Sequence, residues 1–381
     1  RRGITELWAE VLETNRPMRQ LFEKFGGKRE RSRDTEGWLI RMATDEVIKR
    51  ATEFAALRDN KSVHPAVGTQ VLGWYWAEAC LAHDTGPGHV ETPERYQVLG
   101  DALREVALEL DAVPLRGRPI RRKELLRCHA SHYLDLVHID VENLADQLRT
   151  GDTPLCPESE RVAKLGAGAA VDAVDRVMRG EVNRAFVAIR PPGHHATHDR
   201  GMGFCIYNNV ALMARHAQED FGCERVLIVD WDVHHGNGTQ DIFFSDPSVF
   251  FFSAHQEGIY PFSGSSEETG AGPGQGTTMN FPLPAGSGID QLRPLITGPL
   301  HEAMEEFQPQ LVLISAGFDS RVDDPVGEFA LRDEDFAVLT RDLAAIADRW
   351  AGGRMISVLE GGYNPSGLAS AAVAHFRALA E

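Results

Sequence analysis

Short apolar stretches alternate with amphipathic stretches along most of this 381-residue chain, and this alternation constrains the fold more than any other feature. The apolar stretches are rich in β-branched and aromatic residues, which is typical of buried strands. They occupy residues 185–190, 225–231, 249–255, 311–317 and 355–361. Stretches with helical spacing include residues 169–180, 209–222 and 335–350. We therefore predict an α/β fold with a mostly parallel sheet and helices on both faces.

Four of the predicted strands end in loops that are rich in glycine and in polar residues. These loops comprise residues 190–205, 230–238, 315–320 and 359–364. In open parallel sheets, ligands gather beyond the carboxyl ends of the strands. The sequence therefore predicts that the four loops converge on one functional site. A long glycine-rich loop, residues 258–288, also calls for a function because compact domains rarely contain such loops without one.

The loop at 230–238 predicts a metal site. Asp230, Asp232 and His234 occupy alternate positions, so in an extended chain their side chains project to one side. A carboxylate and an imidazole aimed at one point suit Zn²⁺ or Fe²⁺. A catalytic metal needs about three protein ligands, and Asp319 in another of the four loops is the candidate for the third. The alternative is that Asp232 and His234 only hydrogen-bond the loop backbone.

Two adjacent histidines, His194 and His195, follow two prolines and a glycine in the loop at 190–205. Neighbouring side chains of an extended chain point in different directions, so general acid and base roles fit this pair better than joint metal binding. Imidazole titrates near neutral pH. Such bases lean on a second polar group, and Asp230 and Asn237 are the available orienting residues. A purely structural histidine pair is the alternative.

Tyr363 lies on a glycine-flanked turn in the fourth loop. A phenol beside a metal can donate a hydrogen bond to a developing oxyanion, although a buried tyrosine with a satisfied hydroxyl has the same local sequence. We expect no direct catalytic part for His235, the neighbour of His234.

Composition limits the partners and the compartment. The net charge of −17 disfavours direct binding to nucleic acid or to anionic membranes. Five scattered cysteines without a CxxC pair indicate a reducing compartment, and no apolar run approaches the roughly 18 residues that span a bilayer. We expect a cytoplasmic protein, while a chain that starts at Arg1 leaves room for a removed organelle-targeting segment. Assembly into a homo-oligomer is compatible with the sequence.

Residues 1–65 differ from the rest of the chain. They carry 14 Lys and Arg against 11 Asp and Glu, a balance of +3, which leaves −17 − 3 = −20 for residues 66–381. Apolar residues follow helical spacing at 4–12 and again at 47–55, with a solvated loop expected at 26–34. We predict a helical N-terminal extension (1–65) that packs on the main domain (66–381) or on a partner.

The motifs together resemble one known family. The segments "RPPGHHA", "GFCIYNNVALMARHA", "VLIVDWDVHHGNGT", "SAGFDS…DP" and "LEGGYN" look like the histone deacetylase superfamily, and the likeness starts near residue 80. Their wording is closer to the class II and bacterial amidohydrolase branch than to class I. The resemblance implies the arginase–deacetylase fold and a deacetylase catalytic domain over residues 66–381.

The resemblance also implies roles for individual residues. The zinc ligands would be Asp232, His234 and Asp319. The tandem histidines His194 and His195 would handle proton transfers, with Asp230 and Asn237 as their partners. Tyr363 would polarise the scissile amide. The substrate channel would be lined by Gly203, Phe204 and Gly361, with Asp152 at the rim and Tyr260 or Phe262 on a further wall. A structural potassium ion would lie near Asp230, Asp232, His234, Ser253 and Ala254.

The implied reaction is hydrolysis of an N-acetyl or other short acyl group on lysine or on a small amine. Val326 argues mildly against acetylpolyamines, because polyamine-specific relatives can carry a glutamate there. A ureohydrolase of the same fold would need a second metal and more bridging carboxylates. A non-catalytic module that acts through residues 1–65 is a further alternative.

Overall fold

The computed structural model describes residues 6–12, 28–31, 37–43 and 70–381. The chain divides into two compact units, residues 1–67 and 68–381, and each is described by itself. In the first unit, β1 (Glu6–Leu12), β2 (Lys28–Arg31) and β3 (Gly37–Ala43) form an antiparallel sheet in the order β1-β3-β2.

The helix predicted over residues 4–12 is therefore wrong at residues 6–12, and the loop predicted over 26–34 is wrong at residues 28–31, because β1 and β2 pair with β3 along its two edges. A short apolar run fits helix and strand spacing almost equally well, and long-range backbone pairing decides between them. The helical segment expected at 47–55 lies outside the described residues.

The second unit is built on an eight-stranded sheet in the order β5-β4-β6-β11-β10-β7-β8-β9. All seven pairs of neighbouring strands are parallel, which confirms the predicted class of sheet. The strands are β4 (Leu72–Tyr75), β5 (Val113–Pro114), β6 (Arg184–Val187), β7 (Val226–Asp230), β8 (Val249–Gln256), β9 (Thr278–Leu283), β10 (Leu311–Ala316) and β11 (Met355–Leu359). The loop expected at 258–288 is interrupted, since β9 pairs with β8 and forms one edge of the sheet.

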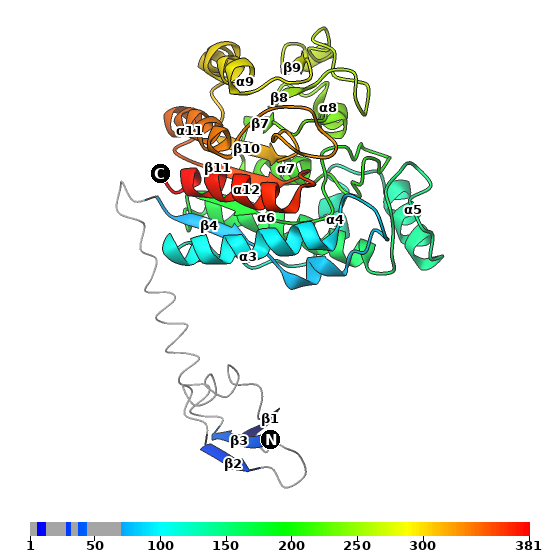
Figure 1. The fold of residues 1–381 in the computed structure, drawn as a ribbon, viewed down its shortest axis with the longest axis vertical. Helices are drawn as coiled ribbons and strands as arrows, with labels where there is room; N and C mark the ends of the chain where they lie inside the picture. Colours follow the sequence, from blue (N-terminus) through cyan, green and yellow to red (C-terminus); the bar gives the residue numbers. More distant parts are fainter. Residues whose placement is uncertain (1–5, 13–27, 32–36, 44–69) are drawn as a thin grey trace. The chain divides into compact units, whose positions relative to one another are not determined.

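Helices cover both faces of this sheet, as predicted (Figure 1). One face packs against α3 (Pro93–Glu109), α11 (Asp333–Trp350) and α12 (Pro365–Leu379). The other packs against α6 (Ser159–Met178) and α7 (Asn209–Phe221). The remaining helices are α4 (Arg122–Leu125), α5 (Ser131–Glu142), α8 (Asn237–Phe243), α9 (Ile289–Leu295) and α10 (His301–Phe307), with short turns at Glu78–Ala82, Gly272–Gly274 and Ile296–Leu300.

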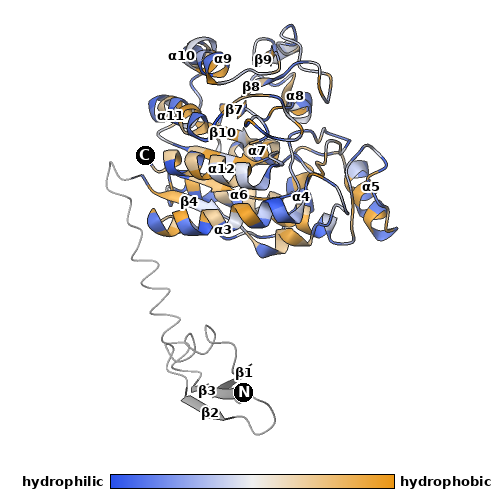
Figure 2. Ribbon diagram, viewed as in Figure 1, coloured by the Kyte–Doolittle hydropathy of each residue, from blue (hydrophilic) through white to orange (hydrophobic). Residues whose placement is uncertain are grey.

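Alternate residues of each central strand enter separate hydrophobic cores. In β7, Leu227 and Val229 lie in the core beneath α11, whereas Val226 and Ile228 lie in the core beneath α7. The central strands are consequently apolar on both faces, and Figure 2 shows their hydrophobic colouring inside a more hydrophilic helical layer. Within the described residues, no helix is long and apolar enough to cross a bilayer.

The strand order determines where polar residues meet. Strands β6, β11, β10 and β7 are consecutive neighbours in the middle of the sheet, and all four run in the same direction. The four loops identified in the sequence follow these four strands. Their side chains therefore meet beyond one edge of the sheet, held by a core that is buried on both faces.

Candidate metal centre and active site

Asp232, His234 and Asp319 form a compact group of metal-ligand type, with one donor atom from each lying within 4.8 Å of the others. The first two come from the loop after β7, and Asp319 comes from the loop after β10. Nδ1 of His234 lies 2.9 Å from Oδ1 of Asp232 and 3.2 Å from Oδ2 of Asp319. Both carboxylates are buried, and His234 is partly exposed. The three predicted ligands are thus brought together.

The electrostatics of this group fit a divalent cation. Burial raises the pKa of Asp319 to about 7, and the neighbouring charge of Asp232 adds to the shift. Burial alone would lower the pKa of His234, but Asp232 and Asp319 outweigh it and raise the pKa to about 10. Oδ2 of Asp319 is buried and has no hydrogen-bond partner of good geometry among the described residues. A buried acceptor without a partner is costly, and a cation bound at this position would satisfy it.

Gly361, predicted to line the channel, lies against these carboxylates. Its N–H donates to Oδ2 of Asp232 at 2.9 Å. A Cβ atom at this position would lie 2.0 Å from Oδ2 of Asp319 and 2.7 Å from Oδ2 of Asp232. Only a residue without a side chain lets the loop after β11 approach the two carboxylates so closely.

The rings of the tandem histidines are close neighbours, with their centroids 4.0 Å apart. Nδ1 of His194 lies 2.9 Å from Oδ2 of Asp230, and Nδ1 of His195 lies 2.7 Å from Oδ1 of Asn237. Both histidines are therefore paired with the residues expected from the sequence. Nε2 of His194 lies 3.8 Å from Oδ1 of Asp232, so the pair adjoins the candidate metal ligands.

The two histidines have opposite pKa shifts. Burial would lower the pKa of His194, but the carboxylates of Asp230 and Asp232 outweigh it and raise this pKa well above its ordinary value. Burial lowers the pKa of His195, and the nearby His194 and His234 lower it further. The amide of Asn237 carries no charge that could compensate. His194 therefore favours the protonated, cationic form, and His195 favours the neutral form.

Glu360 was missed in the sequence, although it lies inside the quoted "LEGGYN" motif. Its buried Oε2 accepts hydrogen bonds from the N–H groups of Gly193 at 2.6 Å and His194 at 3.1 Å. Its Oε1 accepts from the hydroxyl of Ser315 at 3.2 Å, and burial raises its pKa to about 7. Glu360 thus ties the loop after β6 to β10. A charged residue directly after a mostly apolar strand was the available signal.

Tyr363 is nearly buried, and its backbone N–H donates to Oδ2 of Asp324 at 2.7 Å. The Arg95 guanidinium lies over the phenol ring, 5.1 Å from the centroid, and the Phe204 ring meets it edge-on at 6.1 Å. Burial raises the pKa of Tyr363, and the nearby Arg95 only partly opposes this, so the hydroxyl stays protonated and can donate. Sequence reasoning missed Asp324 and Arg95 as supports of this turn.

A buried ion cluster contacts the backbone of the turn that carries Tyr363. Glu91 and Arg190 are both fully buried and pair through Nε at 2.9 Å, and Nε of Arg95 lies 3.0 Å from Glu91. Arg95 also donates to the carbonyl oxygens of Glu360 and Gly362, each at 3.1 Å. A buried cluster of charges with satisfied hydrogen bonds fixes the position of the backbone that it contacts.

The residues predicted for the channel lie around the tandem histidines. Phe204 packs edge-on against His89, with centroids 4.5 Å apart. The N–H of Gly203 donates to Oδ1 of Asp152 at 2.7 Å, and Asp152 is exposed. Of the two candidates for a further wall, Tyr260 contacts His195 edge-on at 5.2 Å, whereas the Phe262 side chain is 80% exposed.

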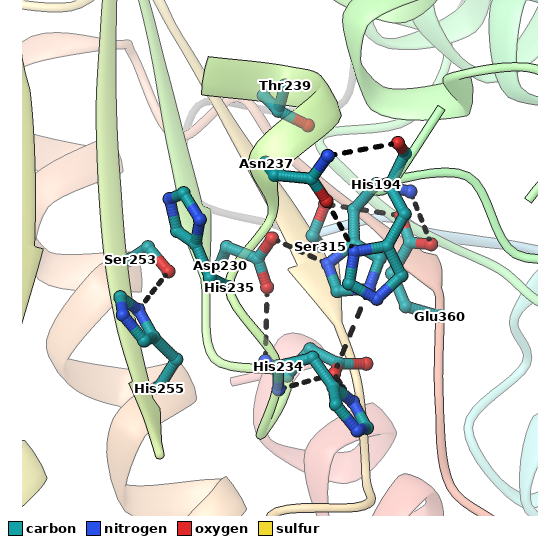
Figure 3. Close-up of polar contacts among 12 residues, drawn as sticks. His194, Asp230, His234, His235, Asn237, Thr239, Ser253, His255, Ser315 and Glu360 are labelled. Carbon is teal, nitrogen blue, oxygen red and sulfur yellow. Dashed lines mark hydrogen bonds and ion pairs between the residues drawn. The ribbon is translucent and has the colours of Figure 1, made fainter. Parts of the chain in front are cut away.

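The residues predicted to hold potassium lie on two paired strands. Asp230 and Ser253 are register partners of β7 and β8, and Oδ1 of Asp230 accepts from the N–H of Asp232 at 3.1 Å. The hydroxyl of Ser253 lies 2.9 Å from Nδ1 of His255 (Figure 3). Ala254, the next residue of β8, is buried.

His235 points away from the candidate metal ligands into a polar network. Its Nδ1 lies 2.8 Å from the hydroxyl of Ser263 and its Nε2 lies 3.0 Å from the side-chain oxygen of Gln240. One ring nitrogen therefore contacts the rim loop, the connection between β8 and β9 (residues 257–277), and the other contacts α8. The expected absence of a direct catalytic part stays a prediction.

This chain is similar to known proteins over most of its length. A family model described as "Histone deacetylase domain" matches residues 89–379. The histone deacetylase-like amidohydrolase of Pseudomonas aeruginosa is 36% identical over 315 residues, covering 78% of this chain and 82% of that protein. The polyamine deacetylase HDAC10 of Mus musculus is 40% identical over 300 residues, covering 76% of this chain and 44% of that protein. The crystal structure of the HDA15 HD domain matches with a TM-score of 0.77 at 33% identity, covering 82% of this chain and 89% of that one.

Proposed function

Because this chain belongs to the histone deacetylase family and has the arginase–deacetylase fold, we propose that it is a zinc-dependent hydrolase of N-acyl amines. The family supports deacetylase activity as such. The identity of the metal, the length of the acyl group and the kind of amine are our proposal. The observation that carries it is the contact between the Asp232–His234–Asp319 group and the tandem histidines.

Asp232, His234 and Asp319 would hold the zinc ion, since two carboxylates and one imidazole with an open position are a catalytic donor set. When bound, zinc supplies a Lewis acid that polarises the amide carbonyl and lowers the pKa of water. Iron(II) accepts the same donors. The unpartnered Oδ2 of Asp319 and the space kept free at Gly361 support this assignment.

The chain's own residues move the proton and stabilise the developing charge. An imidazole of the His194–His195 pair takes the proton of the attacking water as the new carbon–oxygen bond forms. The same proton passes to the amine nitrogen as the carbon–nitrogen bond breaks, which leaves a carboxylic acid and a neutral amine. At neutral pH the acid then gives its proton to the amine, so the released products are a carboxylate and an ammonium group. The Tyr363 hydroxyl donates a hydrogen bond to the carbonyl oxygen as its charge grows. Asp230, Asn237 and Glu360 orient the histidines throughout.

The substrate we propose is an acyl-lysine side chain with an acetyl or other short acyl group. Phe204 and Tyr260 offer aromatic walls for the aliphatic stem of such a side chain. Asp152 lies at the rim, where an exposed carboxylate can accept hydrogen bonds from a peptide backbone.

Acetylpolyamine is a second candidate substrate, favoured by the similarity to mouse HDAC10 and by the net charge of −17. A polycation would be attracted to a strongly acidic protein. Val326 stands where a glutamate would favour polyamines, so we place the acyl-lysine substrate first.

We also propose a structural potassium ion near Asp230 and Ser253, whose strands pair in register. The further residues of this proposed site are Asp232, His234 and Ala254. The buried carboxylate of Asp230 supports it. Exchange of potassium for choline, followed by measurement of the melting temperature and of turnover, tests this part separately.

One experiment tests the main proposal. The purified protein is stripped with a chelator and assayed on an acetyl-lysine peptide and on an acetylpolyamine, alone and after addition of one equivalent of Zn²⁺ or Fe²⁺. We expect release of acetate from the peptide only after metal is restored. Faster hydrolysis of the polyamine would favour the second candidate. Full activity of a metal-free sample, or no activity with any metal on either substrate, would contradict the proposal.

A further inference from the structure

The side chains of Asp152 and Tyr260 join two loops beside the tandem histidines. Oδ1 of Asp152 accepts hydrogen bonds from the N–H of Gly203 at 2.7 Å and from the Tyr260 hydroxyl at 3.3 Å. These three residues belong to segments that are more than 50 positions apart in the sequence. Burial raises the pKa of Tyr260, so its hydroxyl is protonated and donates to the carboxylate.

Both hydrogen bonds fall on one oxygen of Asp152. Among the described residues, no hydrogen bond reaches its other oxygen, Oδ2, and the side chain is exposed. An exposed aspartate ordinarily samples several rotamers. The two donors on Oδ1 restrict the orientation of the carboxylate. They leave Oδ2 free to accept a hydrogen bond from a substrate.

The position of Tyr260 is itself fixed by close packing. A Cβ atom on Gly203 would lie 2.9 Å from the Tyr260 ring and 2.3 Å from the His195 ring, so the glycine lets the phenol pack beside the tandem histidines. The rim loop that carries Tyr260 is anchored underneath by Nε2 of His255, which lies 3.1 Å from the carbonyl oxygen of Gly264. Tyr260 is half-buried as a result, and its hydroxyl points to the rim.

We propose that Tyr260 is a positioning residue that sets the specificity of this site for peptide substrates, because its hydroxyl holds the Asp152 carboxylate ready for backbone N–H groups beside the acyl-lysine. This inference rests on the proposed function and extends it to the class of substrate. The aromatic ring alone would serve as a channel wall. The hydroxyl adds a preference for an acyl-lysine within a peptide over a small acylated amine without amide donors.

The experiment compares the wild-type protein with Tyr260→Phe on two peptides. The first is an acetyl-lysine peptide. The second is the same peptide with N-methyl groups on the backbone amides beside the acetyl-lysine. We expect Tyr260→Phe to raise KM on the first peptide by about three- to fivefold, the size of one ordinary net hydrogen bond, with kcat within about twofold. On the N-methylated peptide the wild-type protein and the variant should have the same KM.

Two further variants make this test specific. Tyr207→Phe is the matched control, because the Tyr207 hydroxyl is buried and has no hydrogen-bond partner among the described residues. It should leave KM unchanged on both peptides. Asp152→Ala should raise KM on the first peptide, and adding Tyr260→Phe to it should cause no further rise, since the hydroxyl acts through the carboxylate.

The outcomes separate this inference from the proposed function. A wild-type protein that hydrolyses neither peptide contradicts the proposed function. An active wild-type protein with the same KM as Tyr260→Phe on the first peptide overturns the role of the hydroxyl alone. Equal rises of KM on both peptides also overturn it, because they would indicate a contact with the acyl-lysine stem. Circular dichroism confirms that each variant is folded.

Discussion

The buried carboxylate of Asp230 pairs with the imidazole of His194 at 2.9 Å, and this contact distinguishes His194 from the adjacent His195. His195 has the uncharged Asn237 as its partner instead. The pKa of His194 is raised and that of His195 is lowered, although their rings are 4.0 Å apart. A pair with opposite preferences for the proton suits a reaction that must both accept and return one.

We expect Asp230→Asn to reduce kcat by about 100-fold or more, because an orienting carboxylate beside a catalytic imidazole contributes on this scale. Steady-state kinetics on an acetyl-lysine peptide measure the loss. Asp101→Asn is the control, since the contacts of Asp101 with Arg104 and Gln97 are both exposed. Unchanged turnover in a folded Asp230→Asn protein would show that His194 does not depend on this carboxylate.

Tyr363→Phe removes one hydroxyl from the nearly buried phenol beneath Arg95. The loss of a hydrogen bond to a developing oxyanion should lower kcat by roughly 10²- to 10³-fold, with little change in KM. Metal analysis of the same sample should still find about one ion per chain. Tyr207→Phe again serves as the control. A fully active Tyr363→Phe protein would rule out the proposed role.

Gly361→Ala should weaken metal binding. Its Cβ would lie 2.0 Å from Oδ2 of Asp319, so the loop or the carboxylate must move. Competition with a zinc-binding dye should show at least about tenfold weaker affinity, since a rigid donor set tolerates little displacement. Gly166→Ala is the matched control, because its nearest neighbours lie at ordinary contact distances of 3.4 to 3.6 Å. Equal zinc affinities for both variants would contradict the proposed ligands.

Glu91→Gln should destabilise the fold by about 3–5 kcal/mol, because it leaves two buried guanidinium groups without their carboxylate. Urea unfolding at pH 7 measures the shift. Glu109→Gln is the control, since the exposed pair of Glu109 with Arg377 should contribute less than about 1 kcal/mol. Similar shifts for both variants would argue against a stabilising role of the buried cluster.

The difference in stability between the wild-type protein and Glu91→Gln should depend on pH. Burial would raise the pKa of Glu91, but Arg190 and Arg95 outweigh it and hold this pKa below its ordinary value. A depressed pKa stabilises the folded state above the unfolded value of about 4.3, and the contribution is lost as the pH falls below it. The difference between the wild-type protein and Glu91→Gln should therefore shrink below about pH 4.3. A difference that grows there would contradict the sign.

Local sequence was sufficient for the central strands and for part of the site. Residues 225–231 were predicted as a strand, and β7 spans Val226–Asp230, because a run that is short, apolar and rich in β-branched residues is typical of a buried parallel strand. The two-residue spacing of Asp232 and His234 brings their side chains within 2.9 Å. Asp230 follows the same spacing, but the sequence predicted it as a partner of a histidine and not as a zinc ligand. Its carboxylate turns towards His194.

The supporting residues could not be predicted from local pattern. Glu360 holds the backbone of His194 from 166 positions away, and Arg95 holds that of Gly362 across 267 positions. Such contacts depend on which strands are neighbours, and β6 lies next to β11 in the sheet although the two are not consecutive in the sequence. For residues 6–12, local pattern gave a wrong prediction. Their apolar residues follow helical spacing, but the segment forms a strand because its backbone pairs with β3.

By itself, the sequence determined the class of fold, the polar loops at the strand ends and the identity of the chemical groups, because each of these follows from side-chain type and spacing within a few residues. Only the tertiary structure decided which oxygen of Asp152 meets Tyr260, which histidine faces a carboxylate and which glycine must remain bare. Those choices depend on the strand order and on the packing of distant loops, and packing is a property of the whole folded chain.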